Sequence, residues 1–287
     1  MDLFLILMPA VSFIIAFFCS QAGVSGAFLL LPFQVSVLGF VNPSVNATNF
    51  FYNVVAIPSG VYRYAKERRF LWILAFVTLL GTIPGIFIGS LVRVIFLLDA
   101  KTFKLFIGIV LLYLGIRLLY TALNPEKKAK TLEEKFKEHG FLKGELNVKK
   151  IGLKRVEFEF WGETYSFSPI LLFIVSFVVG IVGGAYGIGG GALLTPFIVA
   201  FFKLPIYAIS GATLFGTFVT SIVGVLNYSA LGYPPNFKIG LLLGLGGFLG
   251  IYAGAKFQKF VPERKIRVLL SALILALALR YIAQYWW

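Results

Sequence analysis

A glycine-rich motif flanked by apolar segments occurs twice in this chain of 287 residues. The first copy is AGVSGAFLLLPF, residues 22–33, and the second is YGIGGGALLTPF, residues 186–197. A shift of 164 residues (187 − 23) places Gly23 on Gly187 and aligns the leucines, the proline and the final phenylalanine of both copies. The duplication predicts two homologous halves. Glycines between apolar segments also predict places where helices break inside a membrane.

The composition predicts a membrane protein. Mean hydropathy is +0.90, 59% of residues are hydrophobic and only 13% are charged, whereas a soluble domain has about a quarter charged residues. Apolar stretches of roughly 20 residues, the span of a bilayer core, recur along the chain. We therefore expect an all-α polytopic membrane protein. No basic region precedes the first apolar segment, so we expect that segment to stay in the membrane rather than to be removed as a signal peptide.

The chain divides into two transmembrane repeats separated by a polar insertion. We place the first repeat at 1–123, the insertion at 124–167 and the second repeat at 168–287, with about five apolar segments in each repeat. A shift of 165 residues (246 − 81) aligns two glycine triplets, which are Gly81, Gly85 and Gly89 in the first half and Gly246, Gly250 and Gly254 in the second. Four-residue glycine spacing predicts helices that pack closely in lipid.

Basic loops suggest how the chain crosses the membrane. Arginines and lysines cluster at 63–69 and 256–267. Five crossings per half place both clusters and the insertion on one side, which the distribution of basic residues identifies as the cytoplasm, with both termini outside. An odd number of crossings makes the two halves inverted repeats, with broken helices at the glycine loops. Four crossings per half would place the clusters on opposite sides, and we favour five.

The insertion has a different character from the repeats. Lysines and glutamates dominate Pro125–His139, which predicts a short helix. Farther on, Val156, Phe158 and Phe160 alternate with glutamates, which is typical of a half-buried strand. We expect a small cytoplasmic hairpin or three-stranded unit that serves as a structural linker, with a regulatory role as the alternative.

The sequence lacks residues that several classes of function require. Every Asp and Glu lies in the insertion, at the N-terminus or in a connection between apolar segments, which argues against a cation channel or a carboxylate-based proton pump and favours an anion. With one cysteine and one histidine, we expect no metal, no cofactor and no enzymatic hydrolysis. The net charge of +14 lies mostly in loops, because the insertion holds 10 basic and 8 acidic residues. Basic loops indicate a membrane surface rather than nucleic acid as the partner.

The glycine loops are the predicted binding site. Consecutive glycines allow several backbone N–H groups to point at one anion, and a helix that starts just after them adds its positive end. Asn49 and Asn53, like Thr213 and Thr217, are four residues apart and share a helix face. The candidate substrate-binding residues are Gln21, Gly23, Ser25, Gly26, Asn46, Asn49, Asn53, Tyr186, Gly187, Gly189, Gly190, Gly191, Thr213 and Thr217. The alternative is that the glycines and these polar side chains serve only helix packing.

The second motif, GIGGGALLTPF at 187–197 with Gly-Ala-Thr at 211–213, resembles the TauE/SafE sulfite-exporter-like permease family. The first copy departs from the pattern, because Ser25 and Ala27 replace glycines. The resemblance implies transport of small sulfur-containing anions such as sulfite or organosulfonates, often outward. We therefore expect a secondary transporter of the plasma membrane that exports by alternating access. A passive anion channel and a non-transporting membrane scaffold stay open as alternatives.

Overall fold

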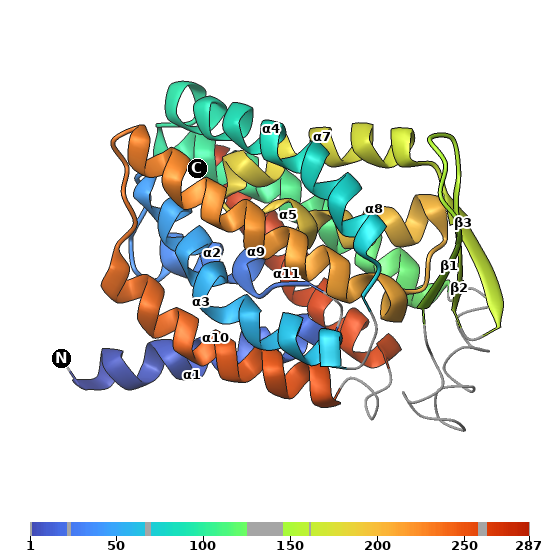
Figure 1. Ribbon diagram of the computed structural model, residues 1–287. Helices are drawn as coiled ribbons and strands as arrows, with labels where there is room; N and C mark the ends of the chain where they lie inside the picture. Colours follow the sequence, from blue (N-terminus) through green and yellow to red (C-terminus); the bar gives the residue numbers. More distant parts are fainter. Residues whose placement is uncertain are drawn as a thin grey trace.

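The computed structural model describes residues 2–21, 24–66, 70–124, 146–160, 162–257 and 263–286. The chain forms a bundle of helices with a small sheet at one end and the N-terminus at the other (Figure 1). The helices of the first half are α1 (Asp2–Gln21), α2 (Ala27–Ser36), α3 (Ser44–Lys66), α4 (Trp72–Phe96) and α5 (Ala100–Leu123). Those of the second half are α7 (Pro169–Tyr186), α8 (Gly190–Phe202), α9 (Ile206–Ala230), α10 (Phe237–Phe257) and α11 (Glu263–Trp286).

Within the described residues, five helices are long and apolar enough to cross a membrane. They are α4, α5, α7, α10 and the part of α9 at Ala208–Ala230. In contrast, α2 has 10 residues and α8 has 13, so at 1.5 Å per residue they rise about 15 and 20 Å, less than a bilayer core of about 30 Å. The predicted multi-pass helical membrane protein is confirmed.

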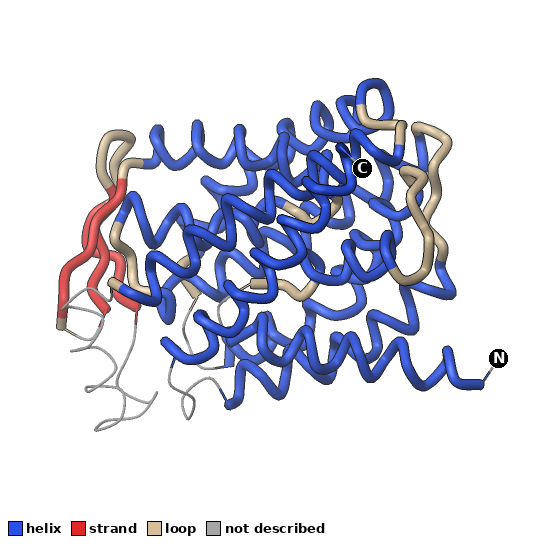
Figure 2. Tube along the Cα trace, turned by 180° about the vertical axis from the view of Figure 1, so that it is seen from behind, coloured by secondary structure: helices blue, strands red, loops and turns tan. Residues whose placement is uncertain are grey.

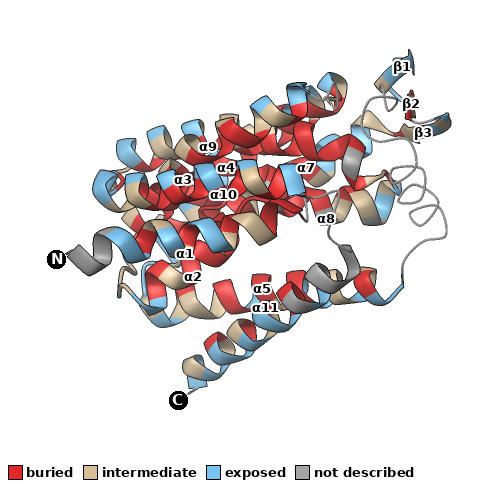
Figure 3. Ribbon diagram, turned by 90° about the horizontal axis from the view of Figure 1, so that it is seen from below, coloured by how far each residue is buried: buried red, intermediate tan, exposed pale blue. Residues whose placement is uncertain are grey.

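The two halves interlock rather than sit side by side. The most extensive helix pairs each combine one helix from each half, namely α4 with α7, α1 with α10 and α5 with α11. At the centre, α3 packs against α9 and α10, and α4 also packs against α9. Buried residues concentrate where α3, α4, α9 and α10 meet, and exposed residues lie on the outward faces (Figure 3). Neither half therefore has a helical core of its own.

The glycine triplets lie at close helix contacts, as predicted. A Cβ atom built on Gly81, Gly85 or Gly89 of α4 would lie 2.6, 2.5 or 2.1 Å from a carbonyl oxygen of α7, contributed by Phe173, Phe177 and Ile181 respectively. A Cβ on Gly246, Gly250 or Gly254 of α10 would lie 2.0, 2.5 or 2.4 Å from a carbonyl oxygen of α1, contributed by Pro9, Phe13 and Phe17. Each triplet thus runs along a row of backbone carbonyls that no larger residue could approach so closely.

The insertion contains a three-stranded antiparallel sheet in the order β1 (Leu146–Lys150), β2 (Val156–Phe160), β3 (Glu163–Phe167). It stands at one end of the helices (Figure 2). The predicted alternation holds, because all three apolar residues of β2 are buried. Phe167 reaches Phe202 at the end of α8, with ring centroids 6.4 Å apart. The helix predicted at Pro125–His139 lies outside the described residues.

Candidate functional site

The second glycine loop is a tight turn that joins α7 to α8. Gly187 ends α7 with φ 85°, and Gly189 precedes α8 with φ 77°, values that strongly favour glycine. The N–H groups of Gly187 and Ile188 donate to the Gly183 carbonyl at 2.8 and 3.1 Å. These two donors therefore cap α7. The helix that follows begins at Gly190, two residues before the alanine at which the apolar pattern starts, because two glycines form its first turn.

The first glycine loop differs in its local bonding. Gly26 precedes α2 in a right-handed helical conformation, with φ −63°. The N–H of Ala27 donates to the Ser25 hydroxyl at 3.2 Å, so a side chain satisfies one donor at the start of α2. Gln21 is buried at the end of α1, and Gly23 lies outside the described residues.

Two asparagines of α3 join the two loops. The Asn49 amide donates to the carbonyl of Ala27 at 2.9 Å and to that of Gly187 at 2.8 Å. The Asn53 amide donates to the Ile188 carbonyl at 3.1 Å, and its oxygen accepts from Ser25. Both asparagines are fully buried. Segments that the duplication places far apart in sequence therefore meet on one face of α3.

These bonds also orient the second turn. A trans peptide points its carbonyl and the following N–H in opposite directions. Because Asn53 holds the Ile188 carbonyl, the N–H of Gly189 points away from α3. The N-cap residue Gly189 makes no side-chain cap hydrogen bond, and the start of a helix carries N–H donors and the positive end of the helix dipole.

The start of α8 is pressed between α4 and α9. A Cβ on Gly190 would lie 2.3 Å from the Thr82 methyl carbon, and one on Gly191 would lie 2.0 Å from the Thr213 carbonyl and 2.3 Å from the Thr217 hydroxyl. The Thr217 hydroxyl donates to the Thr213 carbonyl one turn earlier, at 2.9 Å. The structure thus brings the predicted threonines to the second glycine loop, and it gives the glycines a packing role as well.

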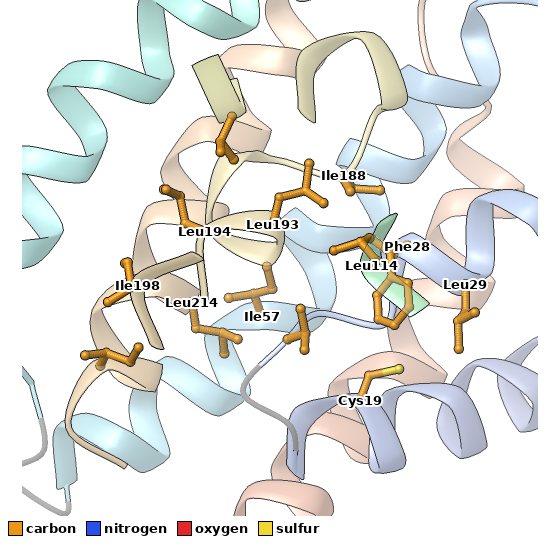
Figure 4. Packing of buried hydrophobic residues seen from close by; sticks show 14 of the residues in the cluster. Cys19, Phe28, Leu29, Ile57, Leu114, Ile188, Leu193, Leu194, Ile198 and Leu214 are labelled. Carbon is orange, nitrogen blue, oxygen red and sulfur yellow. The ribbon is translucent and has the colours of Figure 1, made fainter. Parts of the chain in front are cut away.

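An apolar shell surrounds the loops. Ile188 in the second turn and Phe28 in α2 belong to one buried cluster, which also includes Leu193 of α8 (Figure 4). Tyr186 also lies in this region, and its hydroxyl donates to the Phe28 carbonyl at 2.9 Å. This hydrogen bond connects the end of α7 to α2. Burial away from water strengthens electrostatic interactions at the loops.

Sequence reasoning missed several polar residues next to the loops, among them Gln34, Tyr52 and Arg93. Gln34 of α2 donates to the Asn49 oxygen at 3.1 Å. The buried Tyr52 hydroxyl lies 2.9 Å from where a Cβ of Gly26 would be. Arg93 is fully buried and donates from Nε to the Asn46 oxygen at 3.1 Å. A polar or charged residue within an otherwise apolar segment could have indicated them, because such a residue in a membrane protein usually faces the interior of the bundle.

Asn46 links this arginine to the second loop. Its amide donates to the Ala185 carbonyl at 2.9 Å, and its Cα lies 2.8 Å from where a Cβ of Gly187 would be. All three predicted asparagines therefore contact the second turn. Among the described residues, no group of three or more His, Cys, Asp or Glu side chains could hold a metal ion.

Comparison with known proteins indicates a membrane transporter. Residues 8–281 match the family model described as sulfite exporter TauE/SafE. A probable membrane transporter protein of Bacillus subtilis, YunE, is 23% identical over 79% of this chain and 76% of its own length. A second from that organism, YdhB, is 30% identical over 37% of this chain and 42% of its own. A probable membrane transporter protein of Methanocaldococcus jannaschii is 31% identical over 40% of this chain and 44% of its own. No solved structure matches the chain. The chain therefore belongs to the sulfite exporter TauE/SafE family.

Proposed function

We propose that this protein is a secondary transporter of small sulfur-containing anions, of the sulfite or organosulfonate type, and that it exports them by alternating access. The anion lies between the two glycine loops, at the start of α8. The family name supports the substrate class, and the site supports an anion.

The bridge made by Asn49 is the observation that carries this proposal. One neutral amide holds the carbonyl of Ala27, the first residue of α2, and that of Gly187 in the second turn, so these two carbonyls are directed at α3. The N–H groups at the start of α8 are then left for a ligand. A charge at the bilayer centre costs about 3 kcal/mol on insertion scales, and each hydrogen bond to a charged group returns roughly 1.5–3 kcal/mol. Two or three donors can offset that cost.

The helix pairing supports inverted repeats. The motif alignment relates α1 to α7 and α4 to α10, so the pair α4–α7 corresponds to the pair α10–α1. Both pairs occur, and both are built on the same glycine triplet facing a row of carbonyls. A two-fold relation between the halves would produce this exchange, and a transporter of this construction moves one unit against the other around a fixed site. In this arrangement the insertion is cytoplasmic and the protein resides in the plasma membrane.

Two other functions predict different measurements. A passive anion channel would give flux that does not saturate and shows no counterflow. A membrane scaffold would give no flux and would bind a protein partner through the insertion. A saturable flux with counterflow of sulfite or an organosulfonate is expected for the transporter.

Binding to purified protein tests the site. The probes are sulfite, sulfate, thiosulfate, sulfoacetate and taurine, measured by calorimetry or thermal shift. Thr217→Val keeps the shape of the side chain and removes a hydroxyl of α9 that lies against the first turn of α8. In the structure this hydroxyl gives its proton to the Thr213 carbonyl, so the ligand would have to take that proton. The variant loses only the excess of a hydrogen bond to a charged group over one to a neutral group, and we expect anion affinity to fall about fivefold, roughly 1 kcal/mol.

Thr121→Val is the matched control, because the Thr121 hydroxyl also donates to a carbonyl one turn earlier, that of Arg117, at 2.8 Å on α5. Affinity should stay at the wild-type value in this variant. An unchanged affinity in folded Thr217→Val protein would remove the site from the start of α8. Gly190→Val is a poorer test, because its side chain would collide with Thr82 and disturb packing.

A further inference from the structure

One buried cation lies next to the second glycine loop. Arg93 is in the last turn of α4 and has no exposed surface. Its guanidinium donates to the Asn46 oxygen at 3.1 Å, to the Val41 carbonyl at 2.7 Å and to the Leu97 carbonyl. Its Cζ lies 3.6 Å from the centroid of the Phe103 ring. Every one of these partners is neutral.

The guanidinium has no counter-charge in the described part of the chain, where the ion pairs found are Lys149–Glu159 and Arg155–Glu157. Arginine near a helix end ordinarily extends its charge to the membrane surface, yet this one is held by carbonyls of the α2–α3 and α4–α5 connections and has no exposed surface. Burying a charge is costly unless it is paired, and arginine does not shed its proton. The neutral acceptors satisfy donors of Arg93 but leave its positive charge in place.

A single side chain separates this charge from the second turn. Asn46 accepts from Arg93 with its oxygen and donates to the Ala185 carbonyl, two residues before Gly187. Asn46 also touches the turn directly, because a Cβ on Gly187 would lie 2.9 Å from its amide nitrogen. In a site lined by apolar and neutral groups, the field of a fixed charge at this range is weakly screened.

We propose that Arg93 is the charge-selecting residue of the anion site. Its fixed positive charge, one side chain behind the second turn, makes the site prefer an organosulfonate with net negative charge over one of similar size without it. This inference rests on the proposed anion site. Arg93 acts on the ligand through the field and through Asn46, as a specificity-determining residue that does not itself touch the ligand.

Sulfoacetate and taurine form a suitable pair of probes. Both are two-carbon sulfonates, but the first is a dianion and the second a zwitterion without net charge. The measurement is the ratio of their affinities for purified, folded protein. We expect Arg93→Gln to lower this ratio tenfold or more, and Arg93→Lys to keep it within about threefold. Arg117→Gln is the control, since Arg117 lies over the Phe201 ring at 5.8 Å on α5, away from the loops, and this ratio should not change.

A purely structural role gives a different result. If Arg93 only holds the Val41 and Leu97 carbonyls, Arg93→Gln will weaken both probes equally or neither, and an unchanged ratio overturns the inference. If Thr217→Val weakens anion binding while Arg93→Gln leaves the ratio intact, the site stands and the charge-selecting role fails. If wild-type protein binds none of the anions, the proposed function itself fails.

A second uncharged variant provides the same test if Arg93→Gln does not fold. Arg93→Met keeps a long unbranched side chain beside the Phe103 ring and removes the charge. We expect Arg93→Met to lower the sulfoacetate-to-taurine ratio at least fivefold below that of Arg93→Lys, which keeps the charge. Equal ratios in these two variants would overturn the inference.

Discussion

Gly85→Ala tests whether backbone contact between α4 and α7 stabilises the bundle. The added Cβ would lie 2.5 Å from the Phe177 carbonyl oxygen and 2.8 Å from the Gly180 Cα. Ordinary van der Waals contact begins at 3.4 Å, so the shortfall is 0.9 Å (3.4 − 2.5). The obstructing atoms belong to the backbone, so no side-chain rotation relieves the overlap and the two helices must separate.

The magnitude follows from a comparison with Gly216→Ala. A Cβ on Gly216 in α9 meets only the Thr78 hydroxyl, at 3.6 Å, so this variant gains helix propensity, about 1 kcal/mol, without overlap. Gly85→Ala gains the same propensity but is overpacked, which costs about 1–3 kcal/mol. The difference between the two variants isolates the overpacking and should be about 1–3 kcal/mol. Gly250→Ala, with its Cβ 2.5 Å from the Phe13 carbonyl, should lose a similar amount.

Reversible unfolding of the solubilised protein, by detergent titration or by heat, measures these differences. The expected order of stability is Gly216→Ala, then wild type, then Gly85→Ala and Gly250→Ala together. Gly85→Ala protein as stable as Gly216→Ala would refute the reasoning that these glycines are required for close approach. A loss at Gly85 without one at Gly250 would contradict the equivalence of the two helix pairs.

Three further predictions concern the ends of the bundle. Cysteines introduced at Lys66 and Lys256 should be labelled from one side of the membrane and one at Lys238 from the other; labelling of Lys66 and Lys256 from opposite sides would rule out the topology of five crossings per half. Asp99→Asn should leave transport intact, because Asp99 caps α5 by accepting from the Thr102 N–H at 2.9 Å and asparagine also caps; loss of flux in folded protein would indicate a carboxylate relay. Tyr165→Phe should raise the thermal stability of the sheet, because the buried Tyr165 hydroxyl has no hydrogen-bond partner among the described residues. Burial, and after it the nearby Glu163 carboxylate, raises the pKa of Tyr165 to about 12. The phenol therefore loses its proton less readily in the folded protein than in the unfolded chain. The free energy of unfolding of the wild type should fall between pH 10 and pH 12, and that of Tyr165→Phe should fall less over the same range.

Periodicity and repetition predict the fold well here because they report backbone requirements. A glycine every fourth residue has one economical explanation in an apolar helix, and each triplet faces a row of carbonyls as expected. The alternation at Val156 and Phe158 likewise predicts a strand with one buried face, which the sheet has. In both cases the pattern lies within one segment, so no knowledge of its neighbours is needed.

The partners of the polar residues could not be predicted in the same way. The four-residue spacing places Asn49 and Asn53 on one face, but their partners lie more than a hundred residues away in the second loop. Arg93 is three residues from the end of α4, where an arginine that reaches the surface and a buried one have the same sequence pattern. Only the packing of the α2–α3 connection and Phe103 over its guanidinium distinguishes them.

At the proposed anion site, the asparagines would position the second turn without placing a charge against the ligand. Their donors are committed to the carbonyls of Ala185, Gly187 and Ile188, so they are positioning groups for the second turn. Aspartate at these positions would repel both the carbonyls and an anion, whereas an apolar residue would leave buried carbonyls without partners. Because Asn49 also holds Ala27, a movement of α3 that displaces one loop must displace the other or break both bonds. The two loops should therefore move as one unit, while the closely packed pairs α4–α7 and α1–α10 move as rigid bodies around them.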